Sequence, residues 1–91
     1  MKEIDALLIE LRRLLIRVKV WGSTYELQGK INGLFARVNQ IIKEIDDLDE
    51  MERVRKNAVE VAYLASSLLL EQNLEVMEFL QLLSIPLRET S

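Results

Sequence analysis

The 91-residue sequence contains no cysteine and no histidine. Without cysteine the chain can form neither a disulfide nor a thiolate nucleophile, and without both residues it lacks the usual ligands of zinc and haem. It also lacks imidazole, the commonest general base of enzymes. We therefore expect a protein that is not an enzyme, needs no cofactor or metal and has no small-molecule substrate.

Glycine and proline are scarce as well, with three residues of glycine and one of proline. This scarcity excludes linker-like and collagen-like compositions. Leucine, isoleucine and valine, in contrast, make up 32 of the 91 residues, which is too apolar for a disordered chain. The length suits one small domain, and a domain of this size usually needs something to supplement its core.

No apolar run is long enough to cross a bilayer. The longest weakly polar stretch, 58–70, is interrupted by Glu60 and is shorter than the ~20 residues that a span requires. The N-terminus carries Glu3 and Asp5 where a signal peptide would have a basic region followed by an apolar one. These features predict a cytoplasmic protein with no membrane contact.

Apolar residues recur at intervals of three and four, which predicts amphipathic helices. The second stretch keeps this heptad spacing from 27 to 48, as helices do when they pack at a shallow angle in coiled coils. Gly22 is expected to end the first helix, and Ser23 with Glu26 forms a capping box that would start the second. The helical stretches are 4–18, 27–48, 54–70 and 74–83.

The acidic segment 46–50 predicts a tight turn at about 47–49, with a third helix from near Glu50. Asp49 and Glu52 form a second capping-box pair there. One continuous helix through this segment remains open, because no glycine or proline lies between Leu34 and Ser84. Pro86 is expected to end the last helix.

The fold class predicted from these stretches is all-α. We expect an antiparallel three-helix bundle around a helical hairpin, with a short fourth C-terminal helix or an extended third helix. The domain would span 1–85, and 86–91 would form a short C-terminal tail.

Small residues suggest where two helices approach closely. Two glycines lie four residues apart inside the second helix, where each costs about 1 kcal/mol relative to alanine, so a close helix crossing should compensate. An antiparallel hairpin would place them opposite small residues of the third helix, and a crossing between two chains is the alternative. The candidate packing residues are Gly29, Gly33, Ala58, Ala62 and Ser66.

The helices carry more apolar residues than one inward stripe each can hide. Large exposed apolar patches usually mark interfaces, so we expect a protein partner or self-association. The protein would be an accessory or adaptor subunit of a larger complex, such as a nucleic-acid-processing complex, or a homo-oligomer. The candidate interface residues are Ile9, Ile16, Trp21, Phe35, Ile42, Val59, Tyr63 and Leu70.

The charge is unevenly distributed although the net charge is only −3. Residues 11–43 hold seven basic residues and one acid, whereas 44–52 hold six acids and no base. A basic face on the first two helices makes nucleic-acid binding the alternative function, because cations neutralise phosphates. The candidate basic patch consists of Arg12, Arg13, Arg17, Lys19, Lys30 and Arg37.

Overall fold

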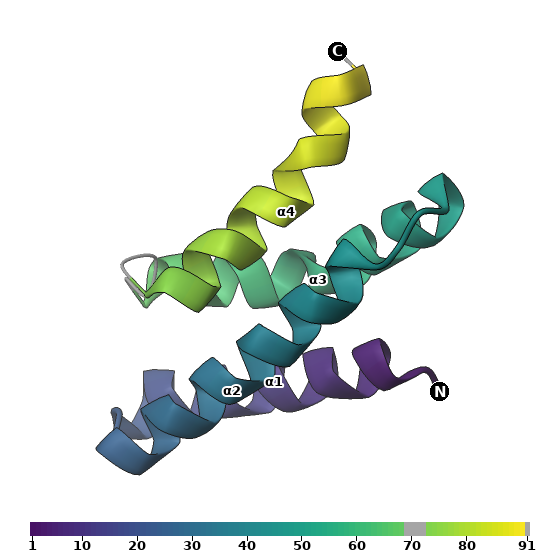
Figure 1. Cartoon of the computed structure of the whole chain (residues 1–91). Coiled ribbons are helices and arrows are strands. Elements are labelled where there is room, and N and C mark those ends of the chain that lie inside the picture. Colours follow the sequence, from purple (N-terminus) through teal and green to yellow (C-terminus); the bar gives the residue numbers. More distant parts are fainter. Residues whose placement is uncertain (69–72, 91) are drawn as a thin grey trace.

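The computed structural model describes the backbone of residues 1–68 and 73–90. Side chains are described for residues 1–68 and 73–83. The described residues form four α-helices and no strand, so the predicted all-α class is confirmed (Figure 1). The helices are α1 (Glu3–Trp21), α2 (Tyr25–Lys43), α3 (Leu48–Ser67) and α4 (Leu74–Thr90).

Helix α1 ends at Gly22, as the sequence predicts. Gly22 has a φ of 88°, which favours glycine, and its N–H donates to the carbonyl of Val18 over 2.8 Å. The cap of α2 is Thr24, whose Oγ1 accepts a hydrogen bond from the N–H of Leu27. The expected cap at Ser23 was one residue too early, because either hydroxyl could fill this role and only the backbone direction decides between them.

The connection between α2 and α3 spans residues 44–47. Asp47 caps α3 by accepting a hydrogen bond from the N–H of Asp49 over 3.0 Å. The expected start near Glu50 and the cap at Asp49 were therefore two residues late. One continuous helix is also wrong, because a short aspartate side chain that binds the free amides of a new helix favours the break.

Helix α4 begins after Asn73, whose Oδ1 accepts hydrogen bonds from the N–H groups of Glu75 and Val76. The helix has 17 residues and continues past Pro86, so it is not the short element that we expected, nor a continuation of α3. Proline removes one backbone hydrogen bond, yet a helix can continue beyond it with a local kink. The domain boundary at 85 stays a prediction.

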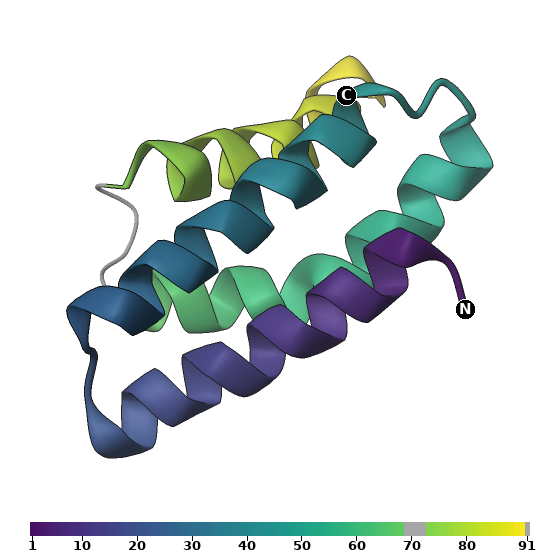
Figure 2. The ribbon, with the colours of Figure 1, turned by 60° about the horizontal axis from the view of Figure 1, so that its bottom comes forward.

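The helices pair in an order that differs from their order in the chain. Helix α1 packs most extensively against α3, and α2 against α4, while α1 and α2 form an antiparallel pair (Figure 2). Both α1–α3 and α2–α4 run parallel, and α3 contacts α4 less. Across the described residues, α2 and α3 are not among the substantially packed pairs, so the expected hairpin between them was wrong.

The core lies between the two parallel pairs. The rings of Phe35 and Phe79 meet edge to face with centroids 5.0 Å apart. Asn39 is the buried polar residue among these helices, and its amide donates to the carbonyl of Glu75 over 2.8 Å. The apolar core residues are Ile4, Leu8, Leu11, Leu14, Leu15, Ile31, Phe35, Val38, Ile42, Val54, Ala58, Val61, Leu64, Ala65, Val76, Phe79 and Leu83.

Candidate interaction surfaces

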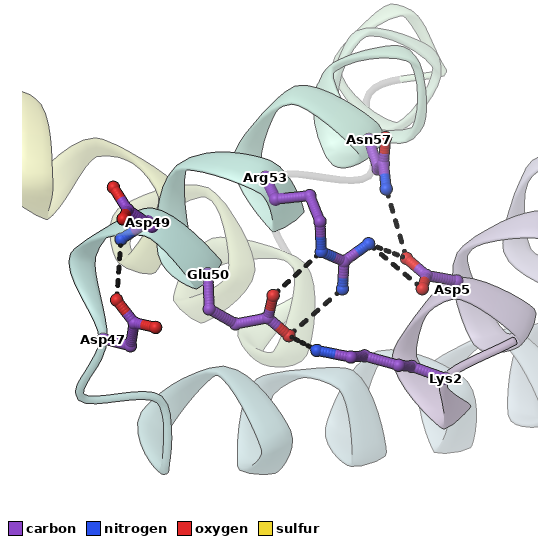
Figure 3. A network of polar contacts seen from close by, with 7 residues as sticks. All are labelled: Lys2, Asp5, Asp47, Asp49, Glu50, Arg53 and Asn57. Atoms are coloured by element: carbon purple, nitrogen blue, oxygen red, sulfur yellow. Dashed lines mark hydrogen bonds and ion pairs between the residues drawn. The ribbon is translucent and has the colours of Figure 1, made fainter.

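A network of polar side chains joins the start of α1 to the start of α3 (Figure 3). The guanidinium of Arg53 binds Asp5 over 3.0 Å and Glu50 over 2.8 Å. Lys2 donates to Glu50 over 2.6 Å, and the amide of Asn57 donates to Asp5. Hydrogen bonds from Arg53 and then Lys2 lower the pKa of Glu50 to about 2. Because these carboxylates are already occupied by cations, the network has a structural role in joining the two helices.

Half of the candidate basic patch is likewise paired. Arg12 binds Glu60 of α3 over 2.7 Å, and Arg37 binds Glu3 across the α1–α2 pair over 2.9 Å. Arg13 binds Glu10 on its own helix over 3.4 Å. The sequence could not reveal the two contacts between helices, because each depends on which helices are neighbours. These three cations are therefore partly neutralised within the molecule.

The other half of the patch gathers at one end of the molecule, which we call the α1–α2 end: the last two turns of α1, residues 22–24 and the first two turns of α2. In the described part of the chain, Arg17, Lys19 and Lys30 form no ion pair. Trp21 and Tyr25 lie at the same end and are 82% and 94% exposed. The structure thus brings the cations and the aromatic residues together, which the sequence reading did not.

A groove of about 340 Å³ opens on this end. Leu14 and Leu27 line its apolar part, and Arg17, Lys30 and Trp21 line it as well. Glu26, Thr24 and Gly22 complete the lining. The groove therefore combines an aromatic ring, two free cations and one carboxylate.

The candidate interface residues do not form one surface. Phe35 and Ile42 are buried in the core, so the expectation that they face a partner was wrong. Helix α4 packs against α2 and accounts for the second apolar stripe of α2 within the chain. Leu70 lies outside the described residues. Ile9 and Ile16 are exposed on α1.

A second groove, which we call the α3–α4 groove, has a volume of about 490 Å³. Its lining is mainly apolar. It lies between α3 and α4, which pack against each other less extensively than the other packed pairs. Val59 belongs to this lining and is 60% exposed, and Tyr63 on the same helix is 69% exposed. The lining residues are Glu52, Arg55, Lys56, Val59, Ala62, Leu80 and Leu83.

The candidate packing residues are also separated. Gly29 and Gly33 are exposed on α2, and a Cβ atom on either would meet no described atom within 4 Å apart from the neighbouring backbone of α2 itself. Ala58 is in the core, Ala62 lines the α3–α4 groove, and Ser66 is exposed. The close crossing of α2 and α3 at these glycines does not occur.

Sequence reasoning missed the buried Asn39 and the role of Arg53. Asn39 stands in the middle of an apolar stripe, and a polar residue there is the signal that could have marked it as a specific contact between helices. Arg53 is one of many charged residues in α3, and its pairing with Asp5 is known only once α1 is placed beside α3.

Within the described ranges, no three acidic side chains lie together as a metal site would require, and no helix is long and apolar enough to cross a membrane. A comparison with protein-family models, curated proteins and solved structures finds no match to this chain.

Proposed function

We propose that this protein is a non-catalytic interaction module that receives an amphipathic helix of a protein partner in the α3–α4 groove. The observation that carries the proposal is the apolar lining of this groove by Val59, Ala62, Leu80 and Leu83. Such a groove is where an apolar helix face packs when one protein recognises a helix of another.

Two further features support this surface. Val59 and Tyr63 are 60% and 69% exposed on one helix, four residues apart and so on neighbouring turns of the same face. Burying both removes apolar area from water at about 25 cal/mol per Å². Helices α3 and α4 contact each other least among the four substantially packed pairs. Side chains on their facing surfaces therefore stay exposed, and an added helix can pack against them.

The charge at the rim specifies the partner further. Arg55 is paired with Glu52, but Lys56 has no ion pair within the described part of the chain. A partner helix with acidic residues beside its apolar stripe would therefore be favoured over a basic one, because charges across an interface set specificity and association rate.

The test is a selection from a displayed library of amphipathic helices against the purified protein. We expect enrichment of helices with apolar residues at i, i+3, i+4 and i+7, and we expect Val59→Asp to weaken their binding by at least about tenfold. Leu48→Asp is the matched control, since Leu48 is 77% exposed on the same helix but lies outside the groove lining.

Failure to enrich any helix would contradict the proposal, as would binding that is equally strong for Val59→Asp. Light scattering over a range of concentrations tests the related possibility of self-association. A dimer that Val59→Asp dissociates and Leu48→Asp leaves intact would replace the partner helix with a second copy of this chain.

A further inference from the structure

The cations of this protein are distributed in a way that the net charge does not reveal. Of the lysines and arginines with described side chains, Arg17, Lys19, Lys30 and Lys56 form no ion pair. Three of these four lie at the α1–α2 end. The acidic segment 44–52 lies in and next to the connection between α2 and α3, at the opposite end of α2 (Figure 2).

The α1–α2 end therefore attracts anions, and its groove has a defined charge. Arg17 and Lys30 approach it from α1 and α2, while Glu26 contributes one negative charge to the same lining. Two cations and one carboxylate leave a net charge of plus one, which complements a single phosphodiester group. The N-terminal end of α2 and the C-terminal end of α1 both lie at this groove, so their opposite helix dipoles offset each other and the side-chain charges carry the attraction for an anion.

The aromatic residues determine which kind of anion fits. Trp21 lines the groove and is 82% exposed, so one face of its indole ring is accessible to a planar group. Tyr25 begins the next helix and is 94% exposed. An aromatic platform next to cations is the arrangement with which proteins hold single-stranded nucleic acid, because each base can stack on a ring while the cations hold the backbone. An acidic peptide would offer carboxylates to Arg17 and Lys30, but only nucleic acid attaches a planar base beside every negative charge of its backbone.

We propose that the α1–α2 end binds single-stranded nucleic acid, with one phosphate between Arg17 and Lys30 and the adjoining base stacked on Trp21. Tyr25 provides a second ring for the following base, and Lys19 adds charge at the same end. Glu26 accepts a hydrogen bond from a donor group of the base. This site is separate from the α3–α4 groove, so it stands or fails independently of the proposed protein interaction.

Trp21 is the single tryptophan of the chain, which makes its fluorescence a direct report of stacking. A short oligothymidylate is titrated into the protein at low salt. We expect quenching of the Trp21 emission and an affinity that falls with salt, with a slope of log K against log salt of about −1.4 for one phosphate at the groove and a second at Lys19.

Variants separate the two contributions. Arg17→Ala and Lys30→Ala together should lower the magnitude of the salt slope by about 0.7. Trp21→Ala, followed by the anisotropy of a labelled oligothymidylate, should weaken binding about tenfold, and Trp21→Phe should weaken it less because the ring is retained. Lys56→Ala is the matched control, because Lys56 is also unpaired but lies at the α3–α4 groove, and its affinity should not change.

Circular dichroism shows whether each variant keeps its helices, which we expect since these side chains are exposed. Absence of quenching at low salt would overturn the proposal, as would quenching that Arg17→Ala and Lys30→Ala leave unchanged. Vesicles containing phosphatidylserine provide the last arm. A shift of Trp21 emission with these vesicles but not with the oligonucleotide would replace nucleic acid with an anionic membrane surface as the ligand.

Discussion

The ring of Phe35 in α2 meets the ring of Phe79 in α4 edge to face, with the planes inclined at 64° and the centroids 5.0 Å apart. Both side chains are fully buried. Aromatic pairs in this geometry contribute beyond the area they bury, by about 0.5–1.5 kcal/mol. This pair therefore fixes α4 onto α2.

Phe79→Ala should lower the free energy of unfolding by about 3–5 kcal/mol, because it removes a ring from a site that cannot fully collapse. Urea denaturation followed by circular dichroism measures this loss. Tyr25→Ala is the control, since Tyr25 is 94% exposed and its removal should change stability by no more than about 0.5 kcal/mol. Equal effects of the two substitutions would contradict the packing of α4 on α2.

Substitution of the two exposed glycines of α2 should stabilise the protein, in contrast to the substitution of Phe79. Gly29→Ala and Gly33→Ala should each raise the free energy of unfolding by about 0.5–1 kcal/mol, because alanine favours the helix and its Cβ meets no described atom within 4 Å beyond the neighbouring backbone of α2. Thermal denaturation of the single and double variants measures the gain. Destabilisation by either alanine would show a close helix crossing at these glycines in solution.

The burial of Asn39 predicts that a charged side chain at this position destabilises the protein. Among the described residues its Oδ1 has no hydrogen-bond partner, and Asn39 is 1% exposed between α2 and α4. Asn39→Asp should destabilise the protein by about 2–4 kcal/mol at neutral pH, since it buries a carboxylate that no cation in the core balances. Burial raises the pKa of such a carboxyl, so lowering the pH should restore part of the stability. Asn39→Leu should cost less than Asn39→Asp at pH 7.

The network at Glu50 predicts a loss of stability in acid. Hydrogen bonds from Arg53 and Lys2 lower the pKa of Glu50 from an unfolded value of 4.5 to about 2. A carboxyl whose pKa is lowered by folding stabilises the protein above its unfolded pKa, and this contribution is lost as the pH falls from about 4.5 through 2. Denaturation midpoints measured across this range should decline less steeply for Glu50→Gln than for the natural sequence. Parallel profiles would show that Glu50 is not paired in solution.

The helices themselves could be predicted from the sequence, whereas their partners could not. The spacing of apolar residues and Gly22 placed the helical segments close to where they lie, because these signals act within a few residues. Which helix covers a given stripe depends on residues far apart in the chain. Phe35 was predicted to face a protein partner because the residue that covers it, Phe79, lies 44 positions later in the chain.

The candidate site at the α1–α2 end could be predicted only in part for the same reason, namely that contacts between distant residues are not visible in the sequence. The sequence placed Arg17, Lys19 and Lys30 in the candidate basic patch and Trp21 among the candidate interface residues, but it offered no means of separating these three cations from Arg12 and Arg37. That separation depends on Glu60 and Glu3, which lie beside those arginines only in the folded chain. The cations without an ion pair can therefore be identified only after the ion pairs of the other cations are known from the structure.

The parallel packing of α1 on α3 also concerns how the chain reaches this fold. Lys2, which directly precedes α1, and Asp5 and Arg12 within it pair with residues 48 positions later, namely Glu50, Arg53 and Glu60. Contacts of such long sequence separation require large loop closures, which slow folding relative to bundles built from local hairpins. A nascent chain that has emerged only through α2 lacks both of its main packing partners. Until α3 and α4 have been synthesised, α1 and α2 can pack only against each other, so part of each apolar stripe stays exposed to solvent.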